Sequence, residues 1–369
     1  MPADPRPRVD GAPLVLVGGA VAQRPGRGGH AWVYLQWLLG LRALGCRVAF
    51  VDRLLPGDEQ VQAAWLRAVF EPYEVSVLLL GRDVVPRADL LLDVMGYVGP
   101  AEVEADRRAF LDIDPGFGQL WAELGLHEPY DGYDAFVTVG TAVGTAGCLV
   151  PTRRLPWLPV LPPVHLPAWP VSAGGPAWRS VASWRGPFAP VEHAGRTYGL
   201  RAHSFRRLLG VAARSEREVE LALDIDDADV ADRDALLAGG YRLADPRTVA
   251  GTPEDYRRYV QGSFGELCVA KSLYVATRGG WFSDRSACYL ASGRPVVAQD
   301  TGWTAALPAG EGLLAFSDTG SAVAALAEVA ADPVRHARAA RELAEEHLSA
   351  AVVLPRLLDA LGAAHCAAA

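Results

Sequence analysis

Residues 279–302 constrain the fold more than any other stretch, because they combine a helix start, a helix stop and a strand in one short segment, GGWFSDRSACYLASGRPVVAQDTG. Ser283 or Asp284 can cap a helix with an apolar side. Gly293 then ends that helix, Pro295 prevents its continuation, and a Val-Val pair begins a strand. A helix start in such a position presents free backbone N–H groups and the positive end of the helix dipole to a cleft. The segment therefore predicts an anion site, with phosphate as the favoured ligand.

The rest of the chain alternates short apolar strands with amphipathic helices. Residues 14–17 form a strand that leads into two glycines, apolar residues then recur at helical spacing up to Leu44, and residues 48–51 form the next strand. Such a βαβ unit requires a parallel sheet with right-handed crossovers. Further strands are predicted at residues 75–80, 90–94, 110–113, 135–139, 180–184, 219–223 and 267–270, and further helices at 198–211, 231–238, 253–263 and 333–347. We therefore expect two α/β domains.

Prolines crowd the middle of the chain, where residues 151–178 contain eight of them in 28 positions. Proline does not continue a helix, and it lacks the N–H that the interior of a sheet requires. We therefore expect this stretch to connect the two domains. Two open α/β domains bind ligands beyond the carboxyl ends of their strands, so the crevice between them is the expected site.

The second half of the 279–302 segment places a Gly-x-Pro sequence, a Val-Val pair and a further glycine at a characteristic spacing: Gly293, Pro295, Val296, Val297 and Gly302. A helix followed by Gly-x-Pro, a Val-Val strand and a glycine turn resembles the nucleotide-binding half of GT-B glycosyltransferases. Residues 262–312 also look like actinobacterial glycosyltransferase-like proteins. The resemblance implies two Rossmann-like domains that face a central cleft, with C-terminal helices that cross back to the first domain.

The resemblance also suggests a division of the chain into three parts. Residues 1–165 are expected to form a Rossmann-like domain on the acceptor side. Residues 166–345 are expected to form a Rossmann-like domain that binds the nucleotide sugar, and residues 346–369 a closing helix that packs toward the first domain.

Two positions depart from the family's pattern. In retaining GT-B enzymes, two glutamates eight positions apart would fall at Gly280 and Cys288. In inverting natural-product and glucuronosyl enzymes, a histidine would fall at position 280. The sequence therefore leaves the stereochemistry open. It also keeps two alternatives to a transferase: a catalytically inactive GT-B-like nucleotide-binding or scaffold protein, and a nucleotide-sugar epimerase.

The resemblance implies that basic residues of the second half neutralise the donor diphosphate without a metal ion. The expected diphosphate contacts are Arg201, Lys271, Ser283, Arg285 and Ser286. The alternative for Arg201 and Lys271 is a surface salt bridge, which contributes little. The alternative for Arg285 is a solvated charge on the helix. The turn after the Val-Val strand is expected to contact the donor sugar through Asp300, Thr301 and Gly302, the alternative being a side chain that only stabilises the turn.

A glycine-rich loop follows the first strand, and Gly18, Gly19, Gly28 and Gly29 are its expected cleft-facing members. His30 lies where this loop enters a helix, so it is a candidate general base for the acceptor hydroxyl. Its alternative is a histidine that merely caps the helix. These glycines do not form the dinucleotide fingerprint G-x-G-x-x-G, because the spacing is wrong.

Asp114 is a second catalytic candidate, because it follows the strand predicted at residues 110–113. A carboxylate at a strand end that faces a cleft can accept a hydroxyl proton or bind sugar hydroxyls. The alternative is a turn residue, since Asp-Pro-Gly is also a common turn sequence.

Composition excludes several classes of function. The formal charge of −8 and the lack of a long basic run argue against a nucleic-acid partner. No apolar run is long enough for a membrane span, and the first thirteen residues do not resemble a secretory signal, so we expect a cytoplasmic protein without integral membrane association. The five scattered cysteines are expected to be buried or free thiols rather than metal ligands.

Together these observations predict a metal-independent, hexosyltransferase-like glycosyltransferase. Its substrates would be a nucleoside-diphosphate sugar and a small-molecule or saccharide acceptor with a hydroxyl group. No cofactor is expected, because the nucleotide sugar is itself the substrate.

Overall fold

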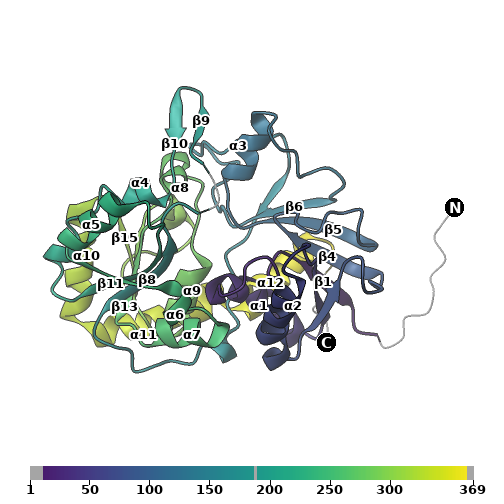
Figure 1. Cartoon of the computed structure of the whole chain (residues 1–369), viewed down its shortest axis with the longest axis horizontal. Helices are drawn as coiled ribbons and strands as arrows, with labels where there is room; N and C mark the ends of the chain where they lie inside the picture. The colour runs from purple at the N-terminus through teal and green to yellow at the C-terminus, as the bar shows by residue number, and fades with distance from the viewer. Residues whose placement is uncertain (1–10, 187–188, 364–369) are drawn as a thin grey trace.

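The structure, a computed structural model, describes residues 11–186 and 189–363 of the chain. Most of the polar N-terminal stretch and Cys366 lie outside the described residues. Two α/β domains lie side by side, the first coloured purple to blue and the second green (Figure 1). The predicted α/β class and the division into two sheet-containing domains are confirmed.

The first domain is built on one seven-stranded parallel sheet in the order β3-β2-β1-β4-β5-β6-β7. Its strands are β1 (Leu14–Gly18), β2 (Arg47–Asp52), β3 (Ser76–Leu79), β4 (Ala88–Val94), β5 (Ala105–Asp112), β6 (Ala135–Thr138) and β7 (Trp157–Pro159). Its helices are α1 (Gly28–Ala43), α2 (Glu59–Phe70) and α3 (Phe117–Glu123). Apart from the edge strand β3, which is only partly buried, the apolar runs read as strands in the sequence form the buried centre of this sheet, as expected for parallel strands covered on both faces.

The proline-rich stretch contributes more to this sheet than the sequence suggested. Residues Trp157–Pro159 form β7, which pairs with β6 in parallel register. The strand lies at the edge of the sheet, where a missing N–H costs no hydrogen bond on the unpaired side, so Pro159 is tolerated. The connection between the two sheets is therefore shorter than expected.

The second domain contains a six-stranded parallel sheet in the order β12-β11-β8-β13-β14-β15. Its strands are β8 (Trp178–Ser183), β11 (Val219–Asp224), β12 (Tyr241–Ala244), β13 (Gly265–Cys268), β14 (Val296–Gln299) and β15 (Leu313–Phe316). Its helices before the C-terminal region are α4 (Arg201–Phe205), α5 (Val230–Ala238), α6 (Pro246–Val249), α7 (Pro253–Gln261), α8 (Ser272–Thr277) and α9 (Asp284–Ala291).

The helix predicted at residues 198–211 is wrong in its extent. A hairpin of β9 (Val191–His193) and β10 (Arg196–Tyr198) precedes it, and α4 begins only at Arg201. The N–H of Leu200 donates to Nδ1 of His203 at 3.1 Å, and this side-chain contact fixes the helix start. The hairpin lies against α3 of the first domain, so it forms a contact between the two halves (Figure 1).

The C-terminal helices return to the first domain, as expected. Helices α10 (Thr319–Ala331) and α11 (Pro333–Leu343) are followed by α12 (Ala350–Ala360), which lies along α1 (Figure 1). A Cβ on Gly40 of α1 would lie 2.7 Å from Ala350 and from Leu354, so α1 and α12 pack closely because Gly40 has no side chain. The chain crosses back beside Val164, whose N–H donates to Leu348 O at 2.8 Å.

Candidate functional site: a cleft lined by both domains

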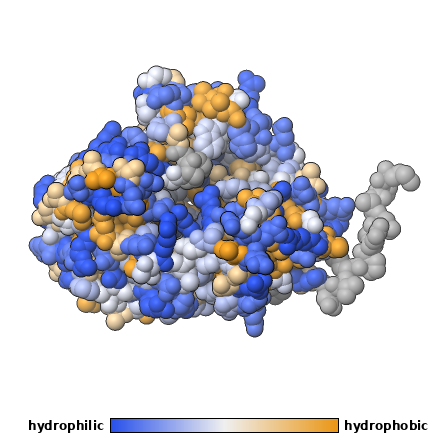
Figure 2. All heavy atoms as spheres, in the orientation of Figure 1, coloured by the Kyte–Doolittle hydropathy of each residue, from blue (hydrophilic) through white to orange (hydrophobic). Residues whose placement is uncertain are grey.

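Two adjoining cavities lie where the loop between β1 and α1 faces the carboxyl ends of β8, β11 and β12. The larger has a volume of about 1050 Å³ and the smaller about 260 Å³. Both are lined by Arg24 and Arg27 from the first domain and by Ser183, Asp224 and Arg247 from the second. Hydrophilic side chains surround the hollow between the domains (Figure 2). The cleft expected between two α/β domains is present at this edge.

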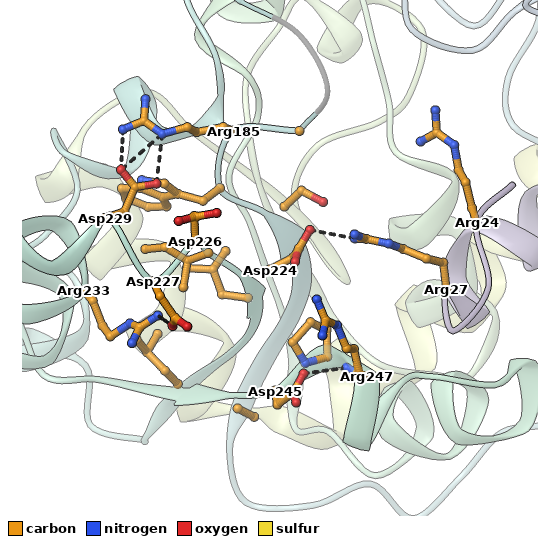
Figure 3. A pocket seen from close by; sticks show the side chains of 18 of the residues that line it. Arg24, Arg27, Arg185, Asp224, Asp226, Asp227, Asp229, Arg233, Asp245 and Arg247 are labelled. Atoms are coloured by element: carbon orange, nitrogen blue, oxygen red, sulfur yellow. Dashed lines mark hydrogen bonds and ion pairs between the residues drawn. The ribbon is translucent and has the colours of Figure 1, made fainter. Parts of the chain in front are cut away.

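The two cavities differ in charge. The larger is lined by five arginines and five aspartates, several of which are already paired (Figure 3). Arg27 contacts Asp224 at 2.8 Å, and Arg233 contacts Asp227 at 2.9 Å. The smaller is lined by five arginines and only two aspartates. An excess of positive charge in a protein of formal charge −8 marks the smaller cavity as a place for an anion.

Arg201 lies at the point of the second sheet where the strand order reverses. There β8 pairs with β11 on one side and with β13 on the other. The Nε of Arg201 donates to Val269 O at 3.0 Å, beyond the end of β13, and its Nη1 donates to Ser183 O at 3.4 Å, at the end of β8. The side chain is buried, and burial followed by the charge of Arg285 lowers the pKa of Arg201. Among the described residues no carboxylate forms an ion pair with this cation, and open α/β sheets bind ligands at this point.

Lys271 and Asp114, two residues that the sequence assigned to different substrates, contact each other across the domain boundary. Lys271 Nζ lies 2.5 Å from an Asp114 carboxylate oxygen, and the hydroxyl of Tyr274 donates to the same carboxylate. Burial lowers the pKa of Lys271, and Asp114 opposes that shift. Neither residue lines the two cavities, so their assigned roles stay predictions.

Arg285 and Ser286 both contact Glu266, a carboxylate that is fully buried on β13. The Nη1 of Arg285 also donates to Val181 O at 2.8 Å. Burial alone would lower the pKa of Arg285, but the Glu266 carboxylate raises it well above its ordinary value. These contacts anchor the start of α9 to β8 and β13. Arg285 also lines the smaller cavity, so it faces the cleft.

Ser283 is the N-cap of α9, as the sequence suggested, although its side chain makes no capping hydrogen bond. It is buried, whereas the neighbouring Asp284 lines the smaller cavity and has its pKa raised by burial. The turn expected to contact the donor sugar lies beneath this segment. The hydroxyl of Thr301 donates to Trp281 O at 2.6 Å, and the carboxylate of Asp300 accepts from Gly302 N at 2.8 Å. None of these turn residues lines either cavity.

His30 lies in the first turn of α1 and lines the smaller cavity. Its Nε2 is 3.1 Å from the carbonyl oxygen of Ala20. A carbonyl can only accept, so Nε2 carries the proton and Nδ1 retains the free lone pair. Burial and the charge of Arg24 lower the pKa of His30 to about 4, so the ring is neutral at physiological pH.

The four glycines assigned to the cleft loop divide into two pairs. A Cβ on Gly18 would lie 2.7 Å from Val98, and one on Gly19 would lie 2.0 Å from the ring of Tyr34. This pair packs inside the first domain. Gly28 and Gly29 instead line the smaller cavity and approach the second domain closely. Gly28 N donates to Ala250 O at 3.1 Å, which no larger residue would allow.

The missing acidic residue at position 280 has a physical reason. Gly280 has a φ of +74°, a conformation that disfavours any L side chain. Its carbonyl accepts from the hydroxyl of Thr141 at 2.9 Å, and a Cβ would lie 2.5 Å from that hydroxyl oxygen. Cys288, at the other glutamate position, is buried and contacts Gln36 of α1 at 3.4 Å. Contacts between the domains occupy both positions.

Several residues that line the cleft were not predicted from the sequence, above all Arg24, Arg27, Asp224 and Arg247. Arg24 and Arg27 stand in the glycine-rich loop between a strand and a helix, and Asp224 ends a strand. Each of these residues ends or follows a strand, and this position in the sequence could have identified them as cleft residues. Only the fold shows that Arg27 and Asp224, far apart in sequence, meet across the cleft (Figure 3).

Within residues 11–186 and 189–363, no three His, Cys, Asp or Glu side chains gather in a way that could hold a metal ion. Over the same ranges, none of the helices has both the length and the apolar character needed to span a bilayer.

Comparison with known proteins identifies the architecture. No protein-family model matches the chain, and no curated protein matches it by sequence. Sucrose-phosphate synthase from Thermosynechococcus elongatus is similar in structure, with a TM-score of 0.59 and 13% identity over 95% of this chain and 100% of that one. HepE from Anabaena, in complex with UDP-glucose, has a TM-score of 0.59 and 11% identity over 95% and 99%.

An alpha-glucosyltransferase in complex with UDP and a DNA 13-mer is also similar, with a TM-score of 0.58 and 11% identity over 95% of this chain and 100% of that one. Identities this low show the fold alone. The chain has the GT-B fold, as the resemblance of its 279–302 segment implied.

Proposed function

We propose that the protein is a glycosyltransferase that moves a sugar, as a hexosyl group, from a nucleoside-diphosphate sugar to an acceptor hydroxyl without a metal ion. The observation that carries the proposal is the smaller cavity, which is lined by five arginines and two aspartates. Arg27 pairs with Asp224 and Arg285 with Glu266, whereas among the described residues no carboxylate forms an ion pair with Arg24, Arg201 or Arg247. A diphosphate supplies the negative charge that this cavity lacks. Structural neighbours in complex with UDP or UDP-glucose are consistent with such a ligand.

In this proposal the second domain holds the donor. The diphosphate lies against Arg201 and the start of α9, where guanidinium and backbone N–H groups stabilise the charge that develops as the sugar leaves. Lys271 joins them once the diphosphate competes with Asp114 for its ammonium group. Ser283 supplies a hydroxyl donor, and Ser286 supplies another once its hydroxyl turns from Glu266 to the diphosphate. The sugar extends toward Asp300, Thr301 and Gly302.

The acceptor lies on the side of the first domain, and it is a small molecule or a saccharide. Nδ1 of His30 takes the proton of its attacking hydroxyl if the reaction inverts configuration. A pKa of about 4 keeps this nitrogen unprotonated at neutral pH, although it also makes His30 a weaker base than an ordinary histidine. Asp114 is the alternative proton acceptor once Lys271 binds the diphosphate.

We further propose that the functional units are residues 1–165, residues 166–345 and the closing residues 346–369. The hairpin β9–β10, which belongs to the second unit, and α12, which belongs to the third, both contact the first unit. Opening of the cleft would therefore have to accommodate both connections.

One structural observation favours a second candidate, a GT-B-like protein that binds a nucleotide without turning it over. The loop at Gly280, where the family carries a catalytic side chain, is covered by Thr141 of the first domain. Binding measurements alone do not separate the two candidates, because both require nucleotide affinity.

The experiment that tests the proposal is calorimetric titration with UDP-, dTDP- and GDP-sugars, preceded by a thermal-shift screen. We expect at least one nucleotide sugar to bind, and its free nucleoside to bind far more weakly because the diphosphate is absent. Binding of the nucleoside and the nucleotide sugar with equal affinity would remove the diphosphate from the smaller cavity. No response to any nucleotide would end both candidate functions.

A further inference from the structure

We infer that Arg24, on the loop between β1 and α1, is an anion-binding residue that the first domain contributes to the smaller cavity. The inference rests on the proposed function, since it concerns a phosphate-bearing substrate of the same site. It goes beyond that function because it gives the first domain a charged ligand contact that the donor site of the second domain does not require.

Arg24 lacks a counter-charge within the described part of the chain. Among the described residues no carboxylate forms an ion pair with Arg24, whose guanidinium donates only to the Tyr97 hydroxyl at 3.4 Å. The neighbouring Arg27 is neutralised by Asp224, and Arg285 by Glu266. Arg24 is only partly exposed, so water compensates its charge less fully than that of an exposed arginine.

The position of Arg24 also favours a ligand held between the domains. Arg24 lines the same cavity as Arg201, the buried cation of the second domain. Figure 3 shows Arg24 on the first-domain side of the cleft, with its guanidinium directed away from the Arg27–Asp224 pair. The charges of Arg201 and Arg24 both lower the pKa of Lys271, so the three cations act on one region. An anion between the domains would relieve this repulsion.

The chemistry of the arginine side chain suits a phosphate ligand. A guanidinium presents its N–H groups in a planar fork that matches the oxygens of a phosphate. Arg201 has committed its Nε and one Nη1 contact to backbone carbonyls, which leaves N–H groups for a ligand. The guanidinium of Arg24 has most of its N–H groups available for a ligand. The ligand is therefore a phosphate group held from both domains, either the diphosphate of the donor or a phosphate carried by the acceptor.

Calorimetry with defined probes tests the inference: pyrophosphate, UDP, GDP and glucose 6-phosphate. The variants are Arg24→Met, Arg24→Lys and a matched control, Arg67→Met. Arg67 is an exposed arginine of α2 in the same domain that lines neither cavity, so its replacement removes the same charge without touching the cleft. Arg24→Met should weaken a phosphate probe about 10- to 100-fold, Arg24→Lys less, and Arg67→Met by less than about twofold.

The pattern over the probes identifies the source of the phosphate. Loss of UDP or GDP affinity in Arg24→Met assigns the contact to the donor, and loss of glucose 6-phosphate affinity alone assigns it to a phosphorylated acceptor. The inference is overturned if Arg24→Met and Arg67→Met bind every probe equally well, or if the wild-type protein binds none. Pyrophosphate binding that depends on Arg24, without binding of any nucleotide, would refute the proposed function and leave this site standing.

Discussion

Replacing Arg285 by methionine should destabilise the protein strongly, whatever happens to nucleotide binding. Arg285 is the cationic partner of Glu266, whose side chain is 0% exposed while that of Arg285 is 10% exposed. Without Arg285, the hydroxyl donors that remain to the Glu266 carboxylate within the described part of the chain are Ser286 at 2.6 Å and Ser180 at 3.5 Å. A buried carboxylate left in this state either stays charged without a cation or takes up a proton.

Removal of one partner of a buried ion pair costs about 3 to 5 kcal/mol. In a domain of this size that corresponds to a fall of roughly 10 °C in the unfolding midpoint. The double variant Glu266→Gln with Arg285→Met removes both charges, and the glutamine can still accept from the two serine hydroxyls. It should therefore recover at least half of the lost stability, because replacement of a whole buried pair is often close to neutral.

Urea unfolding followed by circular dichroism provides the measurement, with Arg338→Met as the control. Arg338 contacts Glu342 at 3.6 Å on the surface of α11, with 71% and 64% of the two side chains exposed, so its loss should cost less than about 1 kcal/mol. If Arg285→Met is no less stable than Arg338→Met, the buried pair does not hold α9 in place. A double variant that is less stable than Arg285→Met would contradict the same reasoning.

The remaining predictions concern three other positions. Lys271→Ala should weaken nucleotide-diphosphate binding by about 1.5 to 3 kcal/mol in calorimetry, and unchanged affinity would take Lys271 out of the donor site. His30→Ala should lower kcat by roughly 10²- to 10⁴-fold if the reaction inverts, with little change in nucleotide affinity; a wild-type rate with a retained anomer would end its role as base. Because the pKa of His30 is lowered to about 4, the unfolded chain takes up its proton first, so its effect is a loss of stability as pH falls from about 6.5 to 4. His30→Gln should reduce the acid-induced fall of the urea midpoint over that range, and an unchanged pH dependence would contradict the shift. Gly280→Glu should not restore the family's acidic residue but should lower the thermal midpoint, because its φ of +74° and the contact with Thr141 leave no room for a side chain; a folded, more active variant would refute this.

The parts of the fold that follow from local chemistry were predictable. The helix at residues 284–291 and the strand after it agree with the structure, because the stop signals at Gly293 and Pro295 act on their immediate neighbours. Most apolar strands of both sheets were found for the same reason, but β7, β12 and β15 were not predicted. The hairpin β9–β10 was missed because each of its strands is only three residues long, too short for a pattern to appear.

The site was less predictable, because its contacts join residues that are distant in sequence. Arg285 was expected to face a diphosphate, yet none of its neighbours in the sequence reveals that Glu266 neutralises it in the fold. The contact of Lys271 with Asp114 likewise depends on how the two domains meet. Conversely, Arg24 stood in a loop noted only for its glycines, and it became a candidate only once the fold set it opposite Arg201.

The central claim is turnover of a nucleotide sugar, and proton NMR of the anomeric signals during incubation with the donor that binds best tests it most directly. The account predicts that the donor's anomeric signal declines while the free nucleoside diphosphate and a released or transferred sugar appear. This decline should be slow with water as the acceptor and faster once a suitable hydroxyl compound is added. A donor that binds but keeps its signal unchanged with every acceptor offered would contradict the claim and identify a nucleotide-binding protein without transferase activity, and conversion into an isomeric nucleotide sugar would identify an epimerase.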